Sequence, residues 1–152
     1  MQINIDKKPG FKISGKSFTI NNREESEKLR EEFLEDFKEK GLEEFGAMFA
    51  LMEYDAINQD YKYFLGFETS DEDFINENNL EVREVEESLY LEVPVENSDL
   101  ESGYKYTYEE FFPNKKYFHN IGPDIEFYQY DQENEKIGNV ELYIALKENP
   151  HA

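Results

Sequence analysis

The sequence predicts an α+β fold made of duplicated β-α-β-β units, with mainly antiparallel sheets, two helices and a cleft between the halves. Three observations support this prediction. Apolar residues alternate with polar ones in several short segments, as half-buried strands require. Two other segments repeat apolar residues with helical spacing. These segments follow in the same order in both halves of the chain, whose 152 residues fit one domain.

The first half begins with a strand that we expect over residues 11–20, where apolar and polar residues alternate. Asn21 and Asn22 can cap the helix that follows, and Gly41 is a stop signal. We expect two further strands over residues 47–57 and 61–69, joined by a turn at 58–60. The apolar stripe of the expected helix consists of Leu29, Phe33, Leu34 and Phe37.

The second half repeats this order. A long strand is expected over residues 80–95. Ser98 with Glu101 can cap the next helix, and Pro113 ends it because proline cannot continue a helix. A pair of strands joined by a polar connection is expected over residues 123–147. The apolar and aromatic residues of the expected helix are Leu100, Tyr104, Tyr108, Phe111 and Phe112.

The chain is strongly acidic, with 36 Asp and Glu against 16 Lys and Arg and a net charge of −20. Direct binding to nucleic acid is therefore not expected, because phosphate backbones attract basic surfaces. Cationic small molecules, divalent cations or basic proteins fit this charge better, although acidic residues also serve only to keep a protein soluble. With no cysteine and no long apolar run, we expect a cytoplasmic protein without disulfides or a membrane span.

Each strand of the last pair carries a glutamate two residues before a tyrosine. Side chains alternate along a strand, so Glu126 shares a face with Tyr128, and Glu141 shares one with Tyr143. If the two faces converge on a cleft, they form an acidic, aromatic site suited to a cationic, flat, apolar molecule. The same pattern is also common on the solvated face of an antiparallel sheet.

Other candidate sites are few. His119 and His151 do not have metal-ligand spacing. The acidic residues 71–73 lack the spacing of a calcium loop and are expected to form a solvated turn. We expect no metal, no cofactor and no catalytic motif, and we expect Met48 and Met52 to pack in the core.

Four segments look like parts of one known family. Residues 106–113 (YTYEEFFP) look like its second helix and stop, and 49–55 (FALMEYD) like a strand running into a Tyr-Asp turn. Residues 125–128 (IEFY) look like its acidic strand, and 140–146 (VELYIAL) like its closing strand. Over residues 11–147 the chain thus resembles the GyrI-like small-molecule-binding domains. These include the effector-binding domains of AraC-type and MerR-type multidrug regulators and the stand-alone gyrase-inhibitory protein.

The resemblance implies a free-standing binding domain over residues 1–152, without a DNA-binding segment, whose ligand is small, amphipathic and cationic. It implies Glu126 and Glu141 as charge partners of that ligand. Many relatives carry a tryptophan beside the cleft; this chain has none, and Tyr104 or Tyr106 can take its place. The aromatic walls that we expect are Tyr128, Tyr143 and Tyr54, with Tyr63 and Tyr106 beside them.

Two alternatives stay open. One branch of the family hydrolyses strained cyclopropane toxins, and there Glu126 or Glu141 would act as the general base. The other alternative is a protein-interaction role, in which the acidic surface occupies the basic groove of a partner such as gyrase. A separate regulator that reads out ligand binding is a further possible partner.

Overall fold

The computed structural model describes residues 2–96 and 99–152, which form one antiparallel nine-stranded sheet with helices packed on it. The strands are β1 (Asn4–Lys8), β2 (Phe11–Ile20), β3 (Ala47–Asp55), β4 (Asp60–Phe67), β5 (Glu81–Val85), β6 (Ser88–Val95), β7 (Tyr117–His119), β8 (Asp124–Asp131) and β9 (Lys136–Glu148). The α-helices are α1 (Glu25–Asp36), α2 (Glu72–Glu77) and α3 (Leu100–Lys105). Two π-helical segments, η1 (Lys38–Glu43) and η3 (Tyr106–Phe111), and a 3-10 turn, η4 (Phe112–Asn114), complete the helical structure.

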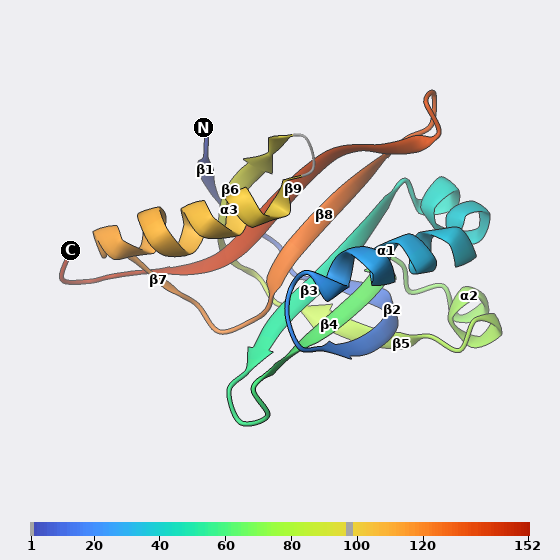
Figure 1. Cartoon of the computed structure of the whole chain (residues 1–152), viewed down its shortest axis with the longest axis horizontal. Coiled ribbons are helices and arrows are strands. Elements are labelled where there is room, and N and C mark those ends of the chain that lie inside the picture. Colours follow the sequence, from blue (N-terminus) through green and yellow to red (C-terminus); the bar gives the residue numbers. More distant parts are fainter. Residues whose placement is uncertain (1, 97–98) are drawn as a thin grey trace.

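The strand order β1-β6-β9-β8-β3-β4-β2-β5 contains the predicted duplication. In each unit (β2-α1-β3-β4 and β6-α3-β8-β9) the first strand pairs with the last, and the last pairs with the middle one. The α+β fold class is confirmed. The cleft does not separate two sheets, however, because β3 and β8 pair directly and join both halves into one sheet. In Figure 1, α1 and α3 lie on the viewer's side of this sheet, with β8 and β3 between them.

The first half follows the prediction closely at its start. β2 spans the expected residues, and Asn22 Oδ1 accepts the backbone N–H of Glu25, the first residue of α1, at 3.2 Å. The predicted stop at Gly41 is wrong, because Gly41 lies inside η1. A Cβ at this position would lie 2.4 Å from ring carbons of Phe67, so glycine is required for close packing.

The single strand predicted over residues 80–95 is also wrong. It consists of β5, which pairs with β2 in the first half, and β6, which pairs with β9 in the second half. The chain therefore passes from one half to the other between these strands. Residues 71–73 likewise begin a helix instead of a turn: Asp71 caps α2 by accepting the backbone N–H of Asp73 at 3.0 Å.

The second long helix begins at Leu100 and runs through η3 and η4, so the predicted end near Pro113 is confirmed. The predicted cap, Ser98, lies outside the described residues. Asp99 provides a cap by accepting the backbone N–H of Ser102 at 3.2 Å.

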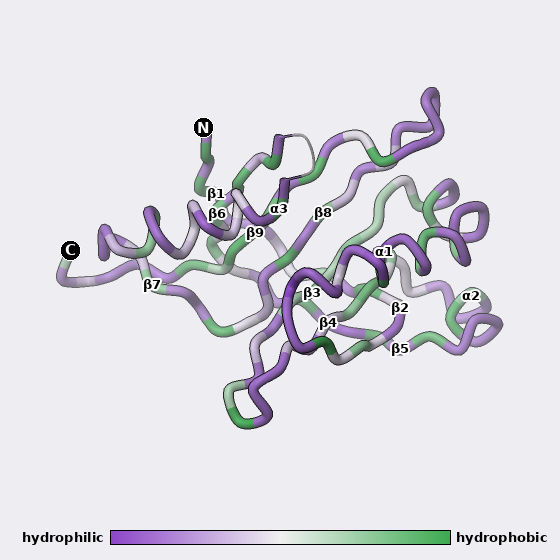
Figure 2. The backbone as a smooth tube through the Cα atoms, in the orientation of Figure 1, coloured by the Kyte–Doolittle hydropathy of each residue, from purple (hydrophilic) through white to green (hydrophobic). Residues whose placement is uncertain are grey.

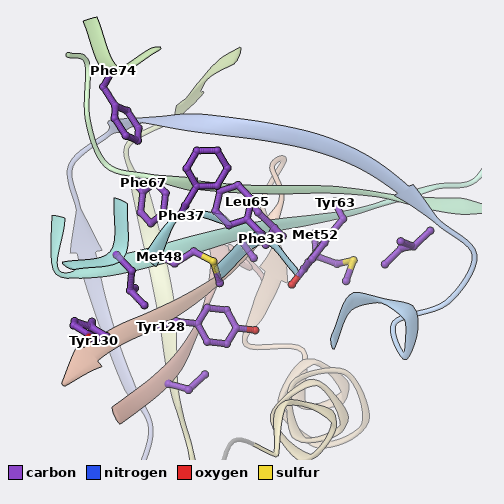
Figure 3. Close-up of a cluster of buried hydrophobic side chains, with 14 residues drawn as sticks. Phe33, Phe37, Met48, Met52, Tyr63, Leu65, Phe67, Phe74, Tyr128 and Tyr130 are labelled. Carbon is purple, nitrogen blue, oxygen red and sulfur yellow. The ribbon is translucent and has the colours of Figure 1, made fainter. Parts of the chain in front are cut away.

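The main buried cluster lies between α1 and the sheet and contains Phe33, Phe67, Met48 and Met52 (Figure 3). The two methionines pack in the core as predicted. Outside this contact α1 is hydrophilic over most of its length (Figure 2). Among the residues described, no helix is both long enough and apolar enough to cross a membrane.

Candidate functional site

Glu126 is a buried carboxylate on the side of β8 that faces the two helices, and its residue is 1% exposed. Tyr63 and Tyr128 donate hydrogen bonds to its Oε1 at 2.7 and 2.6 Å. Tyr104 donates to Oε2 at 2.6 Å. Arg30 Nη1 lies 3.7 Å from Oε1. Three phenols and one guanidinium group thus replace the water that a buried carboxylate loses.

These partners come from four separate elements: Tyr128 from β8, Tyr63 from β4, Tyr104 from α3 and Arg30 from α1. Alternation places Glu126 and Tyr128 on one face of β8. In Figure 3 the hydroxyl groups of Tyr63 and Tyr128 point into the same region beside the core cluster, where both bind Glu126 Oε1. The carboxylate therefore connects both halves of the duplicated fold to both helices.

A cavity of about 580 Å³ opens above this carboxylate, between α1 and α3; we call it the Glu126 cavity. Leu34, Met52, Leu100 and Ile137 supply apolar wall. Two guanidinium groups line it, those of Arg23 and Arg30. Six carboxylates line it, those of Glu24, Glu27, Glu31, Asp99, Glu101 and Glu126. The excess of carboxylates makes the cavity negative, and such a field concentrates cations at its mouth.

Both arginines lie against aromatic rings of this cavity. The Arg23 guanidinium is 4.5 Å from the ring centre of Tyr104, and that of Arg30 is 5.3 Å from the ring centre of Tyr128. Arg30 also donates to the Tyr63 hydroxyl at 3.0 Å. Burial lowers the pKa of Arg30, but its contacts with Tyr63, Tyr128 and Glu126 outweigh this effect and raise that pKa. Two cationic side chains of the protein itself thus lie in the cavity.

The three tyrosines remain protonated donors. Burial first, and then the negative charge of Glu126, raise the pKa values of Tyr63, Tyr104 and Tyr128 well above their ordinary value. Their rings and hydroxyls therefore form a fixed, neutral shell around one negative charge, open on the cavity side.

Residues 4–146 match the family model Cass2, described as an integron-associated effector binding protein. The chain belongs to the Cass2 family. A comparison with curated proteins found no match.

Solved structures share the fold of this Cass2-family chain at low sequence identity. SAV2435 bound to tetraphenylphosphonium has a TM-score of 0.70 and 12% identity, and the match covers 97% of this chain and 94% of that one. Integron cassette protein VCH_CASS2 of Vibrio cholerae has a TM-score of 0.63 and 14% identity, with 95% of each chain covered. The C-terminal domain of EcmrR has a TM-score of 0.63 and 14% identity, with 97% and 98% covered. The predicted GyrI-like fold is thereby confirmed.

The structure brings together Glu126, Tyr128 and Tyr63 of the predicted site residues but separates Glu141 from them. Glu126 pairs across the strands with Leu142, whereas Glu141 pairs with Phe127. Paired residues share a face, so Glu141 and Tyr143 lie on the opposite side of the sheet. The prediction of one cleft shared by both glutamates is therefore wrong for this Cass2-family chain.

The other predicted walls are also placed outside the Glu126 cavity. On the opposite face, Lys8 Nζ lies 4.8 Å from the ring centre of Tyr143. Tyr106 packs against the apolar cluster beneath α3. Tyr54 is 55% exposed near the β3–β4 turn, with its ring centre 5.1 Å from that of Tyr61. Tyr54 lies on the same sheet face as Glu126, because it follows Met52 by two residues on β3.

Sequence reasoning missed the roles of Arg23 and Arg30, and it considered Tyr104 only as a replacement for tryptophan. A signal for the arginines was present. They are seven residues apart and so lie near the same helical face, beside the apolar stripe that contains Leu34. In a segment this rich in glutamate, arginines beside the apolar stripe are expected to face the rest of the domain and not the solvent.

Proposed function

We propose that this Cass2-family domain binds a small organic cation with an apolar, aromatic body in the Glu126 cavity. Membership of an effector-binding family supports small-molecule binding, and a protein of the same fold is bound to tetraphenylphosphonium. The observation that carries the proposal is the 1% exposed carboxylate of Glu126 at the floor of a cavity with five further carboxylates on its walls.

The binding step exchanges one cation for another. A ligand cation takes the place of the Arg30 guanidinium beside Glu126, while its rings lie against Tyr104 and Tyr128. Each cation–π contact of this kind contributes about 0.5–2 kcal/mol, depending on how far it is desolvated. Few directional hydrogen bonds are left for the ligand, because the phenols already donate to Glu126. The site therefore selects for charge and aromatic shape.

The test measures thermal unfolding of the wild type, Glu126→Gln and Glu141→Gln with tetraphenylphosphonium. At 100 times its dissociation constant, a ligand stabilises the folded state by about 2.7 kcal/mol. This corresponds to a rise of at least several degrees in the unfolding midpoint. We expect the rise in the wild type and in Glu141→Gln, because Glu141 lies on the other face, and its loss in Glu126→Gln.

A neutral probe with a similar aromatic body, triphenylphosphine oxide, controls for apolar binding alone. An equal rise with this probe, or an unchanged response in Glu126→Gln, would contradict the proposal.

The hydrolytic alternative needs Glu126 to orient a water molecule. Both its oxygens already accept phenolic hydrogen bonds, which favours ligand binding over base catalysis. The role as a partner of gyrase, and readout by a separate regulator, stay predictions from the sequence.

A further inference from the structure

The cleft continues beyond the Glu126 cavity. A second cavity of about 380 Å³ adjoins it, and Arg23 and Met52 line both. Its other walls include Tyr54, Tyr108 and Asp124, and we call it the Asp124 cavity. None of these walls belongs to the shell around Glu126.

The two cavities share one floor. Asp124 and Glu126 are two residues apart on β8, and Met52 and Tyr54 are two apart on β3, so each pair lies on one face. Tyr61 stands opposite Tyr54 on β4, in the same row as Tyr63. Two residues along a strand advance by about 6.6 Å. The side chains of Asp124, Tyr54 and Tyr61 therefore repeat the arrangement of Glu126, Met52 and Tyr63, displaced by this distance along the sheet.

Two tyrosines of the second helix match the spacing of the two carboxylates, Glu126 and Asp124, on β8. Tyr104 and Tyr108 are four residues apart on the path from α3 to η3, which advances about 6 Å. Tyr104 donates to Glu126, and Tyr108 donates in the same way to Asp124. Each carboxylate thus comes from β8 and accepts a hydrogen bond from a phenol of the helix, and a tyrosine of β4 lies on the same face: Tyr63 bonds to Glu126, and Tyr61 lines the Asp124 cavity.

Each carboxylate also has a cation of the protein beside it. Arg30 plays this part at Glu126. At Asp124 it is His119, whose Nε2 lies 2.8 Å from Oδ1 while its Nδ1 faces the carbonyl oxygen of Asn120. Two acceptors at the two ring nitrogens favour the doubly protonated imidazolium. The second cavity is therefore built on the same plan as the first.

Arg23 lines both cavities and is held by one ion pair and by the face of Tyr104, whose ring centre is 4.5 Å away. It lies in the turn before α1 and pairs at 3.0 Å with Glu101, whose side chain is 67% exposed. Exposed ion pairs contribute little to stability and are easily exchanged. When Arg23 moves outward, the Asp124 cavity loses one positive charge and keeps the carboxylate of Asp124 beside the His119 imidazolium.

We propose that the two cavities form one elongated site for a linear ligand with two cationic aromatic groups, one beside each carboxylate. This inference rests on the proposed function of the Glu126 cavity. The first group takes the place beside Glu126. The second displaces Arg23 and stacks in the corner of Tyr54 and Tyr61, whose rings are inclined at 59°. A ligand with a single cation occupies only the first cavity.

The experiment compares pentamidine, which carries two benzamidinium groups on a five-carbon linker, with benzamidine by titration calorimetry. We expect the wild type to bind pentamidine at least tenfold more tightly than benzamidine, beyond the twofold gain that two equal ends give by statistics. Tyr54→Leu lowers this ratio at least threefold. Arg23→Gln raises the ratio, because the second cation no longer has to displace the Arg23 guanidinium. Tyr54 is 55% exposed, so its replacement leaves the fold intact, whereas Asp124→Asn disturbs a buried group.

Phe118→Leu is the matched control, since Phe118 is a 43% exposed aromatic residue outside both cavities, and it leaves the ratio unchanged. Tetraphenylphosphonium is titrated in parallel. A ratio of two or less with tetraphenylphosphonium still bound overturns the elongated site and leaves the proposed function standing. Absence of binding by all three probes overturns both.

Discussion

Arg30 occupies the position that a bound cation needs in the Glu126 cavity. Its guanidinium reaches Glu126, the Tyr63 hydroxyl and the face of Tyr128 at once, and its side chain is 15% exposed. A buried carboxylate without such a partner is costly, so Arg30 stabilises the empty domain. The same contact opposes ligand binding, because every cation that enters must replace it.

Replacing Arg30 by glutamine therefore has two opposite effects. We expect Arg30→Gln to lower the free energy of unfolding by about 1.5–3 kcal/mol, the usual range for a hydrogen bond to a charged group. We expect tetraphenylphosphonium to stabilise the variant more than it stabilises the wild type, because no guanidinium competes. Urea unfolding with and without the ligand measures both effects.

Lys28→Gln is the control for this prediction. It removes the same charge from α1 at an exposed residue that does not line the Glu126 cavity. A ligand response in Arg30→Gln that is smaller than in the wild type would mean that Arg30 helps to bind the ligand.

At the scale of single residues, the sequence predicted Glu126 and Glu141 as joint charge partners but could not tell which of them faces the helices. A shift of one residue in the pairing of β8 with β9 would exchange the faces of Glu141 and Leu142. Alternation within one strand carries no information on this register. The bulge between Tyr128 and Tyr130 and the partner strands decide it, and these are properties of the folded sheet.

At the scale of elements, the second helix is attached to β8 by hydrogen bonds and to β7 by ring contacts. Tyr104 and Tyr108 donate hydrogen bonds to Glu126 and Asp124 of β8, and His119 at the end of β7 pairs with Asp124. Tyr108 and Phe112 stack on the His119 ring, with centre distances of 6.2 and 5.7 Å. The groups that titrate or carry charge next to this imidazole are therefore Asp124 and Tyr108.

These contacts predict a pH dependence of stability. The hydrogen bond to Asp124 raises the pKa of His119, and this outweighs burial, which lowers it. Because the folded state holds this proton more tightly, His119 contributes its full stabilisation below the ordinary value of about 6.5. The contribution is lost as the pH rises through the higher pKa of the folded state.

We therefore expect the difference in unfolding free energy between wild type and His119→Gln to shrink from pH 5.5 to pH 8.5. Urea unfolding at four pH values in this range measures it. His151→Gln is the control, because His151 is exposed near the end of the chain and its replacement changes nothing. A difference that is constant with pH would show that the His119 contact is not ionic.

Elements that depend on local sequence signals were predicted accurately, and elements that depend on pairing between distant segments were not. β2 was predicted to the residue because its alternation and the Asn22 cap are local signals. The strand over residues 80–95 was predicted whole because its alternation continues, and only pairing with opposite halves divides it. The six-residue helix α2 was missed, since it is too short for a helical repeat to show.

At the scale of the whole molecule, the net charge of −20 acts on folding and on binding in opposite ways. Repulsion among like charges opposes the compact state, whereas the same field draws cations toward the Glu126 cavity. Part of that field is local, since Glu27 and Glu31 on α1 line the cavity itself. Salt screens both effects, with a Debye length of about 10 Å at 0.1 M.

Adding sodium chloride from 0.02 to 0.5 M should therefore raise the thermal midpoint of the empty domain while weakening its affinity for tetraphenylphosphonium. Glu27→Gln with Glu31→Gln should weaken the ligand at low salt and flatten the salt dependence of its dissociation constant. Glu72→Gln with Glu77→Gln removes the same charge from exposed residues of α2, outside the cavity. This pair should weaken the ligand and flatten the salt dependence much less. Equal effects of the two pairs would mean that the ligand senses only the total charge. In that case the carboxylates at the cavity would have no special part in attracting it.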